Sequence, residues 1–167
     1  MANPLYDRLF GVHAGKPTPF LKRPDGQVLT HQAFLGIGAQ LAHVMTGLGL
    51  QPGDRVAVQV EKSAEALALY AACVQAGLVF LPLNTAYTVD ELRYFIENSG
   101  ASLIVCSDKS KDQMVAVGES LGAKVETLNG DGSGSLMAQA KTMPDTFPTV
   151  AREADDLAAF LYTSGTT

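Results

Sequence analysis

Cysteine is scarce in this sequence, and lysine and arginine form no cluster. Cys73 and Cys106 stand in separate apolar segments without metal-ligand spacing. Both are therefore predicted to be buried free thiols, which suit a reducing cytoplasm. The 12 basic residues are scattered and are outnumbered by 17 acidic ones, giving a net charge of −5. This balance argues against a nucleic-acid partner.

The sequence also lacks a convincing membrane segment. Residues 1–10 contain no apolar core of the kind that secretory signals need. Residues 66–89 carry no charge, but Gln75, Gly77, Pro82 and Asn84 interrupt them, and Pro82 would break a spanning helix. A buried helix followed by a buried strand explains this segment better. We therefore expect no membrane span and a cytoplasmic location.

What the sequence does contain is the pattern of an α/β domain. It has 167 residues and 47% hydrophobic residues, enough for one ordinary domain with a sizeable core. Two strand–helix–strand units are predicted, and the right-handed crossover in each implies a parallel pair of strands. We expect a mainly parallel sheet with helices on both faces. The first unit covers 55–60, 64–75 and 78–83, and the second covers 102–106, 111–121 and 124–128.

Further elements are predicted around these two units. A short helix is expected over residues 4–10, a hairpin turn at Pro24-Asp25-Gly26, and a short helix over 135–141. Thr30 can cap a helix whose apolar residues recur at steps of three and four. Thr88 and Glu91 match a capping box that opens a helix through Asn98.

The last eleven residues hold the strongest indication of function. Leu157 to Tyr162 has the length and the aromatic end of a strand. The hydroxyl-rich run that follows suits an anion, because hydroxyls donate to phosphate oxygens and a glycine lets backbone N–H groups turn toward a ligand. By itself such a run is also typical of a surface turn. The candidate phosphate-binding residues are Thr163, Ser164, Gly165, Thr166 and Thr167.

Other candidate sites have ordinary explanations. Glu153, Asp155 and Asp156 suggest a metal, but a solvated entry to the last strand is the commoner explanation of such a group, and no metal site is predicted. His31 and His43 are interpreted as solvated or packed side chains. A P-loop NTPase is excluded because G-x-x-x-x-G-K-[ST] is absent, and no G-x-S-x-G surrounds Ser164.

Three blocks together resemble the adenylate-forming superfamily of acyl-CoA synthetases, luciferases and peptide-synthetase adenylation domains. The first is Leu29-Thr-His-Gln-Ala-Phe34, in which His31, Ala33 and Phe34 depart from the family pattern. The second is the block from Val74 to Asn84, similar to A-G-x-x-x-x-P-L-[ND]. The third, Tyr162-Thr-Ser-Gly-Thr-Thr167, resembles the start of the family's phosphate loop.

Within the superfamily the sequence is most similar to malonyl-CoA synthetases, at residues 61–67, 81–88, 125–128 and 154–159. The resemblance implies the N-terminal subdomain of the adenylate-forming fold. It also implies an acid–thiol ligase that uses ATP, Mg²⁺ and CoA, with residues 163–167 on the ATP phosphates. The family's later lysine, acyl pocket, CoA site and C-terminal domain have no counterpart here. Residues 1–167 are therefore expected to be an inactive N-terminal part of the large AMP-binding domain, ending inside its phosphate loop.

Two other interpretations stay open at this point. One is a different fatty-acyl- or aryl-CoA ligase of the same superfamily. The other is a non-catalytic phosphate-binding or structural module. Lys62, Asn84 and Tyr87 belong to the family blocks, and packing and loop shape are the roles that the sequence supports for them.

Overall fold

The computed structural model describes residues 2–163, so Ser164 to Thr167 of the predicted loop lie outside the described residues. Its centre is a four-stranded parallel sheet in the order β4-β3-β5-β6. The strands are β3 (Arg55–Gln59), β4 (Val79–Pro82), β5 (Leu103–Cys106) and β6 (Lys124–Thr127). Both predicted strand–helix–strand units are confirmed.

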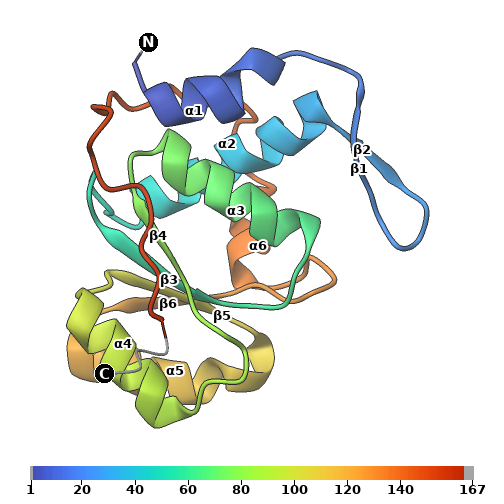
Figure 1. The fold of residues 1–167 in the computed structure, drawn as a ribbon. Helices are drawn as coiled ribbons and strands as arrows, with labels where there is room; N and C mark the ends of the chain where they lie inside the picture. Colours follow the sequence, from blue (N-terminus) through green and yellow to red (C-terminus); the bar gives the residue numbers. More distant parts are fainter. Residues whose placement is uncertain (1, 164–167) are drawn as a thin grey trace.

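Helices cover both faces of this sheet, as expected (Figure 1). One face packs against α1 (Pro4–Leu9), α2 (His31–Gly47), α3 (Ala64–Gln75) and α6 (Ser135–Ala140). The other face packs against α4 (Val89–Ser99) and α5 (Lys111–Leu121). The two apolar clusters lie on opposite sides of β3 and β5, whose side chains alternate between them. The fold is therefore a three-layer α/β arrangement.

Local signals set the helix boundaries. The hydroxyls of Thr30 and Ser63 each accept a hydrogen bond from a backbone N–H in the first turn of α2 and α3. Thr88 and Glu91 form the predicted capping box at the start of α4. Gly49 takes a φ of 94° just after α2, which a residue with a side chain rarely adopts. The helices α2, α3 and α4 therefore begin at their capping residues.

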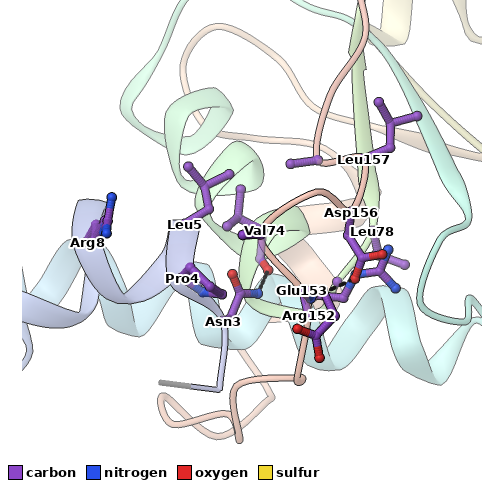
Figure 2. Close-up of a pocket in the computed structure, with 13 residues that line it drawn as sticks. Asn3, Pro4, Leu5, Arg8, Val74, Leu78, Arg152, Glu153, Asp156 and Leu157 are labelled. Carbon is purple, nitrogen blue, oxygen red and sulfur yellow. Dashed lines mark hydrogen bonds and ion pairs between the residues drawn. The ribbon is translucent and has the colours of Figure 1, made fainter.

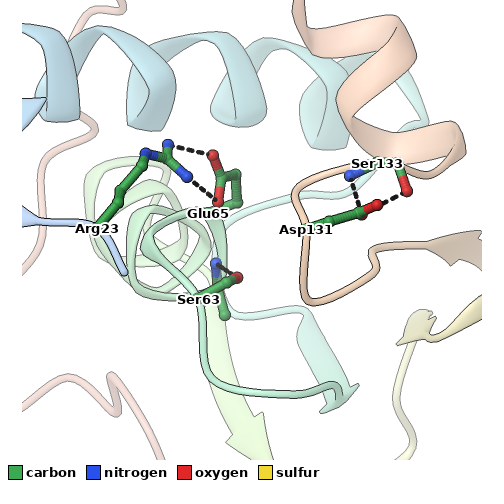
Figure 3. A network of polar contacts seen from close by, with 6 residues as sticks. Arg23, Ser63, Glu65, Asp131 and Ser133 are labelled. Atoms are coloured by element: carbon green, nitrogen blue, oxygen red, sulfur yellow. Dashed lines mark hydrogen bonds and ion pairs between the residues drawn. The ribbon is translucent and has the colours of Figure 1, made fainter. Parts of the chain in front are cut away.

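The N-terminal hairpin lies apart from the main sheet. Its antiparallel strands are β1 (Pro19–Lys22) and β2 (Val28–Thr30), and two strands alone are marginally stable. Arg23, at the turn of the hairpin, forms a two-pronged ion pair with Glu65 in the first turn of α3, with Nη2–Oε1 at 2.5 Å and Nη1–Oε2 at 3.3 Å (Figure 3). The hairpin is thereby tied to the helical layer.

Two short 3-10 turns, Gly11–His13 and Asp108–Ser110, complete the regular structure. In the described part of the chain, no helix combines the length and the apolar character needed to cross a bilayer. Cys73 and Cys106 are both buried free thiols, as predicted. Burial raises the pKa of each thiol, so neither is a reactive thiolate at neutral pH.

Candidate functional site

The segment that leads to the predicted phosphate loop runs along the free edge of β4 (Figure 1). The N–H of Phe80 donates to the carbonyl of Ala158 at 2.9 Å, and the N–H of Phe160 donates to the carbonyl of Phe80 at 3.3 Å. These bonds form a single parallel bridge between Phe80 and Ala159. The segment therefore joins the sheet at the outer edge of β4.

The predicted strand from Leu157 to Tyr162 is nevertheless wrong in extent, because only this one bridge forms. Phe80 turns both its N–H and its carbonyl toward the segment. In a strand, the residue two positions later directs its backbone groups to the same side. That residue is Pro82, which has no N–H to donate. The ladder between β4 and the segment therefore ends after one bridge.

Beyond the bridge, Tyr162 fastens the segment to α4. Its hydroxyl lies 2.6 Å from Oδ1 of Asn98 and 3.4 Å from the carbonyl of Phe95. Its ring packs on the ring of Phe95 at a tilt of 33°, with centroids 4.3 Å apart. Thr163 follows directly and is exposed. Of the five predicted phosphate-binding residues, Thr163 is the one that the structure places, at the carboxyl end of the edge segment.

The sequence did not indicate Asn98 and Phe95 as partners of this segment. Phe95 is half-buried and is covered by Tyr162. A signal was available, since residues three positions apart share one face of a helix. An aromatic and an amide on one face are a suitable surface for a tyrosine.

The carboxyl ends of the parallel strands meet around a cavity of about 300 Å³. The helices that follow β3 and β5 lie on opposite faces of the sheet, so the ends of these two strands border a switch point, where open α/β sheets bind ligands. Polar side chains line most of the cavity, among them Gln59, Glu61, Thr85, Tyr87, Ser107 and Ser110. A small polar ligand would find hydrogen-bond partners here.

The charges next to this cavity do not suit a triphosphate. A hollow beside it is lined by Glu61, Asp108, Lys109 and Asp131. A hydrogen bond from Asn129 lowers the pKa of Asp108, and hydrogen bonds from Ser133 lower the pKa of Asp131. Both carboxyl groups are therefore charged at neutral pH and repel phosphate.

The block residues Asn84 and Tyr87 shape the loop after β4. The side chain of Asn84 accepts a hydrogen bond from the N–H of Ala86, and the Gln59 amide donates to the carbonyl of Asn84 at 2.9 Å. The ring of Tyr87 packs on Phe95, with centroids 4.8 Å apart. Lys62 lines an apolar hollow beside Tyr70 and Phe80. Packing and loop shape therefore account for Asn84 and Tyr87.

A second cavity, of about 360 Å³, lies near the start of β4, where Asn3, Leu78 and Leu157 are among the residues that line it (Figure 2). Asn3, buried at its edge, donates to the carbonyl of Val74 at 2.8 Å. Asp156 pairs with Arg152 at 3.0 Å and accepts from the N–H of Glu153. Among residues 2–163 no three His, Cys, Asp or Glu side chains lie close enough to hold a metal ion. The acidic run serves as a local ion pair and turn.

The two histidines singled out in the sequence are packed. Nε2 of His43 lies 2.8 Å from the carbonyl of Thr146, and its ring meets Phe147 edge to face. His31 stacks on His13, with centroids 4.3 Å apart. Both histidines lie on α2, and their contacts are with residues other than those of the edge segment.

This three-layer α/β arrangement, with its edge segment running along β4 to Thr163, is the N-terminal subdomain of the adenylate-forming fold. The model of the family described as AMP-binding enzyme matches residues 12–167, and the chain belongs to this family. The fold and family that the sequence motifs predicted are thereby confirmed.

The chain is similar in sequence or structure to several known proteins. MatB from Rhodopseudomonas palustris, solved without ligand, superposes with a TM-score of 0.95 at 45% identity, covering 100% of this chain and 33% of that one. The same values hold for its ATP-bound structure. Feruloyl-CoA synthase from an Amycolatopsis species is 32% identical over 87% of this chain and 28% of its own length. Surfactin synthase subunit 2 from Bacillus subtilis (strain 168) is 31% identical over 86% of this chain and 4% of its own length. The chain therefore spans only a minor part of each relative.

Proposed function

We propose that this chain is the N-terminal part of the large domain of an AMP-forming acyl-CoA synthetase whose acid is malonate. In the first step the malonate carboxylate attacks the α-phosphorus of ATP, releasing pyrophosphate and leaving malonyl-adenylate. In the second step the thiol of CoA attacks the acyl carbon and displaces AMP, giving malonyl-CoA. The observation that supports this most is the 45% identity with MatB, a malonyl-CoA synthetase, over the whole chain.

The role proposed for this chain lies in the first step. Departing pyrophosphate develops charge, which positioned hydroxyl and amide donors stabilise. We assign this task to Thr163, Ser164, Gly165, Thr166 and Thr167, the first of which stands at the end of the edge segment. Mg²⁺, when bound, supplies positive charge beside the triphosphate. The described residues offer no cluster of His, Cys, Asp or Glu side chains for it.

The test of substrate class is pyrophosphate release by the full-length protein with malonate, acetate, benzoate and octanoate in turn. We expect the highest kcat/KM with malonate. A site for malonate needs a cation that pairs with the second carboxylate, and acetate would leave that cation unpaired. The 167-residue chain alone is assayed in the same way and should release no pyrophosphate. A higher kcat/KM with octanoate or benzoate would favour another acyl-CoA ligase of the family. If the full-length protein released no pyrophosphate with any of the four acids, the non-catalytic phosphate-binding module would be favoured instead.

The loop can be tested separately in the full-length protein. Replacing Thr163, Ser164 or Thr166 by alanine should slow adenylation about 10- to 100-fold, because each donor to a charged group contributes about 1.5–3 kcal/mol. Thioester formation from supplied malonyl-AMP should change little, since pyrophosphate has already left. Stopped-flow measurement of the two half-reactions checks this. Equal slowing of both would show a structural role for the loop.

A further inference from the structure

The backbone of the edge segment loses its support just before the predicted phosphate loop. Phe160 makes the last backbone bond to β4, and Pro82 prevents the next one. Within residues 2–163, the N–H groups of residues 161–163 have no hydrogen-bond partner. Leu161 and Thr163 are exposed, so their side chains add little restraint. The position of Thr163 therefore depends on Tyr162.

Tyr162 is held by two kinds of contact with one face of α4. The hydroxyl donates to Oδ1 of Asn98 at 2.6 Å, and the ring packs on Phe95. Burial raises the pKa of Tyr162, so the hydroxyl keeps its proton and remains a donor at neutral pH. Because the ring and the hydroxyl are held by different contacts, the orientation of the Tyr162 side chain is fixed. The position of Thr163, the next residue, is fixed with it.

The helix that receives Tyr162 is itself well fixed. Leu92 and Ile96 of α4 are buried in the core beneath the sheet, at 2% and 1% exposure. The capping box at Thr88 and Glu91 holds its first turn. Tyr87, just before the helix, also packs on Phe95, with ring centroids 4.8 Å apart. A rigid support with a locked aromatic ring is what precise placement of a functional group requires.

We propose that Phe95 and Asn98 are positioning residues that act through Tyr162 to place the start of the phosphate loop against ATP. They replace the strand ladder that Pro82 interrupts. This proposal rests on the proposed function, because it assigns the loop to ATP. It adds that a helix on the far side of the sheet from α3 determines how well the loop engages the nucleotide.

The test measures adenylation by full-length variants at varied ATP. Tyr162→Leu removes both contacts and should lower kcat/KM for ATP about 10- to 100-fold, since a misplacement of about 1 Å can reduce a rate by that much. Tyr162→Phe keeps the ring and should lower it only about three- to tenfold. Thioester formation from supplied malonyl-AMP should stay near the wild-type rate in both. A general loss of folded protein would instead lower both half-reactions together.

Matched variants isolate the hydrogen bond. Tyr94→Phe removes a hydroxyl from a ring of the same helix that is 60% exposed, and it should leave kcat/KM unchanged. Asn98→Asp retains an acceptor and should resemble the wild type, whereas Asn98→Ala should resemble Tyr162→Phe. The double variant Tyr162→Phe with Asn98→Ala should be no worse than either single one, because both remove the same bond.

Hydrogen exchange on the 167-residue chain provides a readout that does not need activity. Tyr162→Leu should speed exchange of the amides of Phe80 and Phe160, whose hydrogen bonds form the bridge next to Tyr162, and leave those of β3 and β5 unchanged. If this variant leaves both the exchange and kcat/KM for ATP at wild-type values, the positioning role is refuted while the proposed function stands. If the wild-type protein forms no adenylate, the proposed function fails, and faster exchange or its absence still decides whether Tyr162 holds the segment.

Discussion

Replacing Gly118 by alanine should lower the free energy of unfolding by about 3 kcal/mol, at the upper end of what overpacking usually costs. Gly118 lies inside α5, where β6 returns against the helix. A Cβ at this position would stand 2.6 Å from the carbonyl oxygen of Ala123 and 2.8 Å from Cγ2 of Val125. The first neighbour is backbone, so α5 must move away from β6 to make room. Urea unfolding followed by far-UV circular dichroism gives the change.

Gly47→Ala is the matched control for this substitution. Gly47 is also helical, at the end of α2, and a Cβ there would meet nothing within 4 Å. Alanine favours a helix over glycine by as much as about 1 kcal/mol, so this variant should be equal to or more stable than the wild type. If Gly118→Ala proved as stable as Gly47→Ala, the close contact between α5 and β6 would be wrong.

Replacing Arg23 by alanine should lower stability by about 2–4 kcal/mol. The side chain of Glu65 is only 8% exposed, and without Arg23 it would keep a buried charge with no cation beside it. The guanidinium is 25% exposed, which places the expected loss somewhat below that of a fully buried pair. Arg23→Lys should recover part of the loss, because an ammonium cannot bond both carboxylate oxygens in the same plane. Thermal and urea unfolding measure the series.

Two further variants separate the ion pair from the hairpin as a whole. Lys22→Ala removes an exposed neighbouring cation and should change stability by less than about 0.5 kcal/mol. In the Arg23→Ala background, Glu65→Gln should restore stability, because a neutral amide tolerates burial better than a lone carboxylate. A double variant less stable than Arg23→Ala would contradict the unpaired charge as the cause.

Elements determined by short-range signals could be predicted closely from the sequence. The helices predicted over 64–75 and 111–121 match α3 and α5 at both ends. For α3, Ser63 caps one end and Gly77 follows the other with a φ of 71°. The Thr88 capping box and the hairpin around Pro24 were also predicted correctly. Each of these rests on residues a few positions apart, which the sequence displays directly.

Features that depend on the strand order could not be predicted in this way. The sequence shows Pro82 in a strand, but not that its nitrogen faces the edge that receives the last segment. Only the order β4-β3-β5-β6 reveals this, and it shortens the predicted strand to one bridge. Arg23 and Glu65, or Asn98 and Tyr162, meet through tertiary packing over tens of residues. The predicted roles of Ser164 to Thr167 remain predictions, because these residues lie outside the described part of the chain.

The pairing of the last segment with β4 also sets a schedule for the nascent chain. Eighty positions separate Phe80 from Phe160, the residue that completes the bridge. Because synthesis adds about 5–20 residues per second, the outer edge of β4 remains unpaired for roughly 4–16 s before Phe160 is made. An uncovered strand edge is a template for pairing with another chain. Pro82 limits the final ladder to one bridge. It likewise limits the number of hydrogen bonds that a strand of another polypeptide can form with this edge. The proline that weakens the finished edge thereby protects the unfinished protein from aggregation.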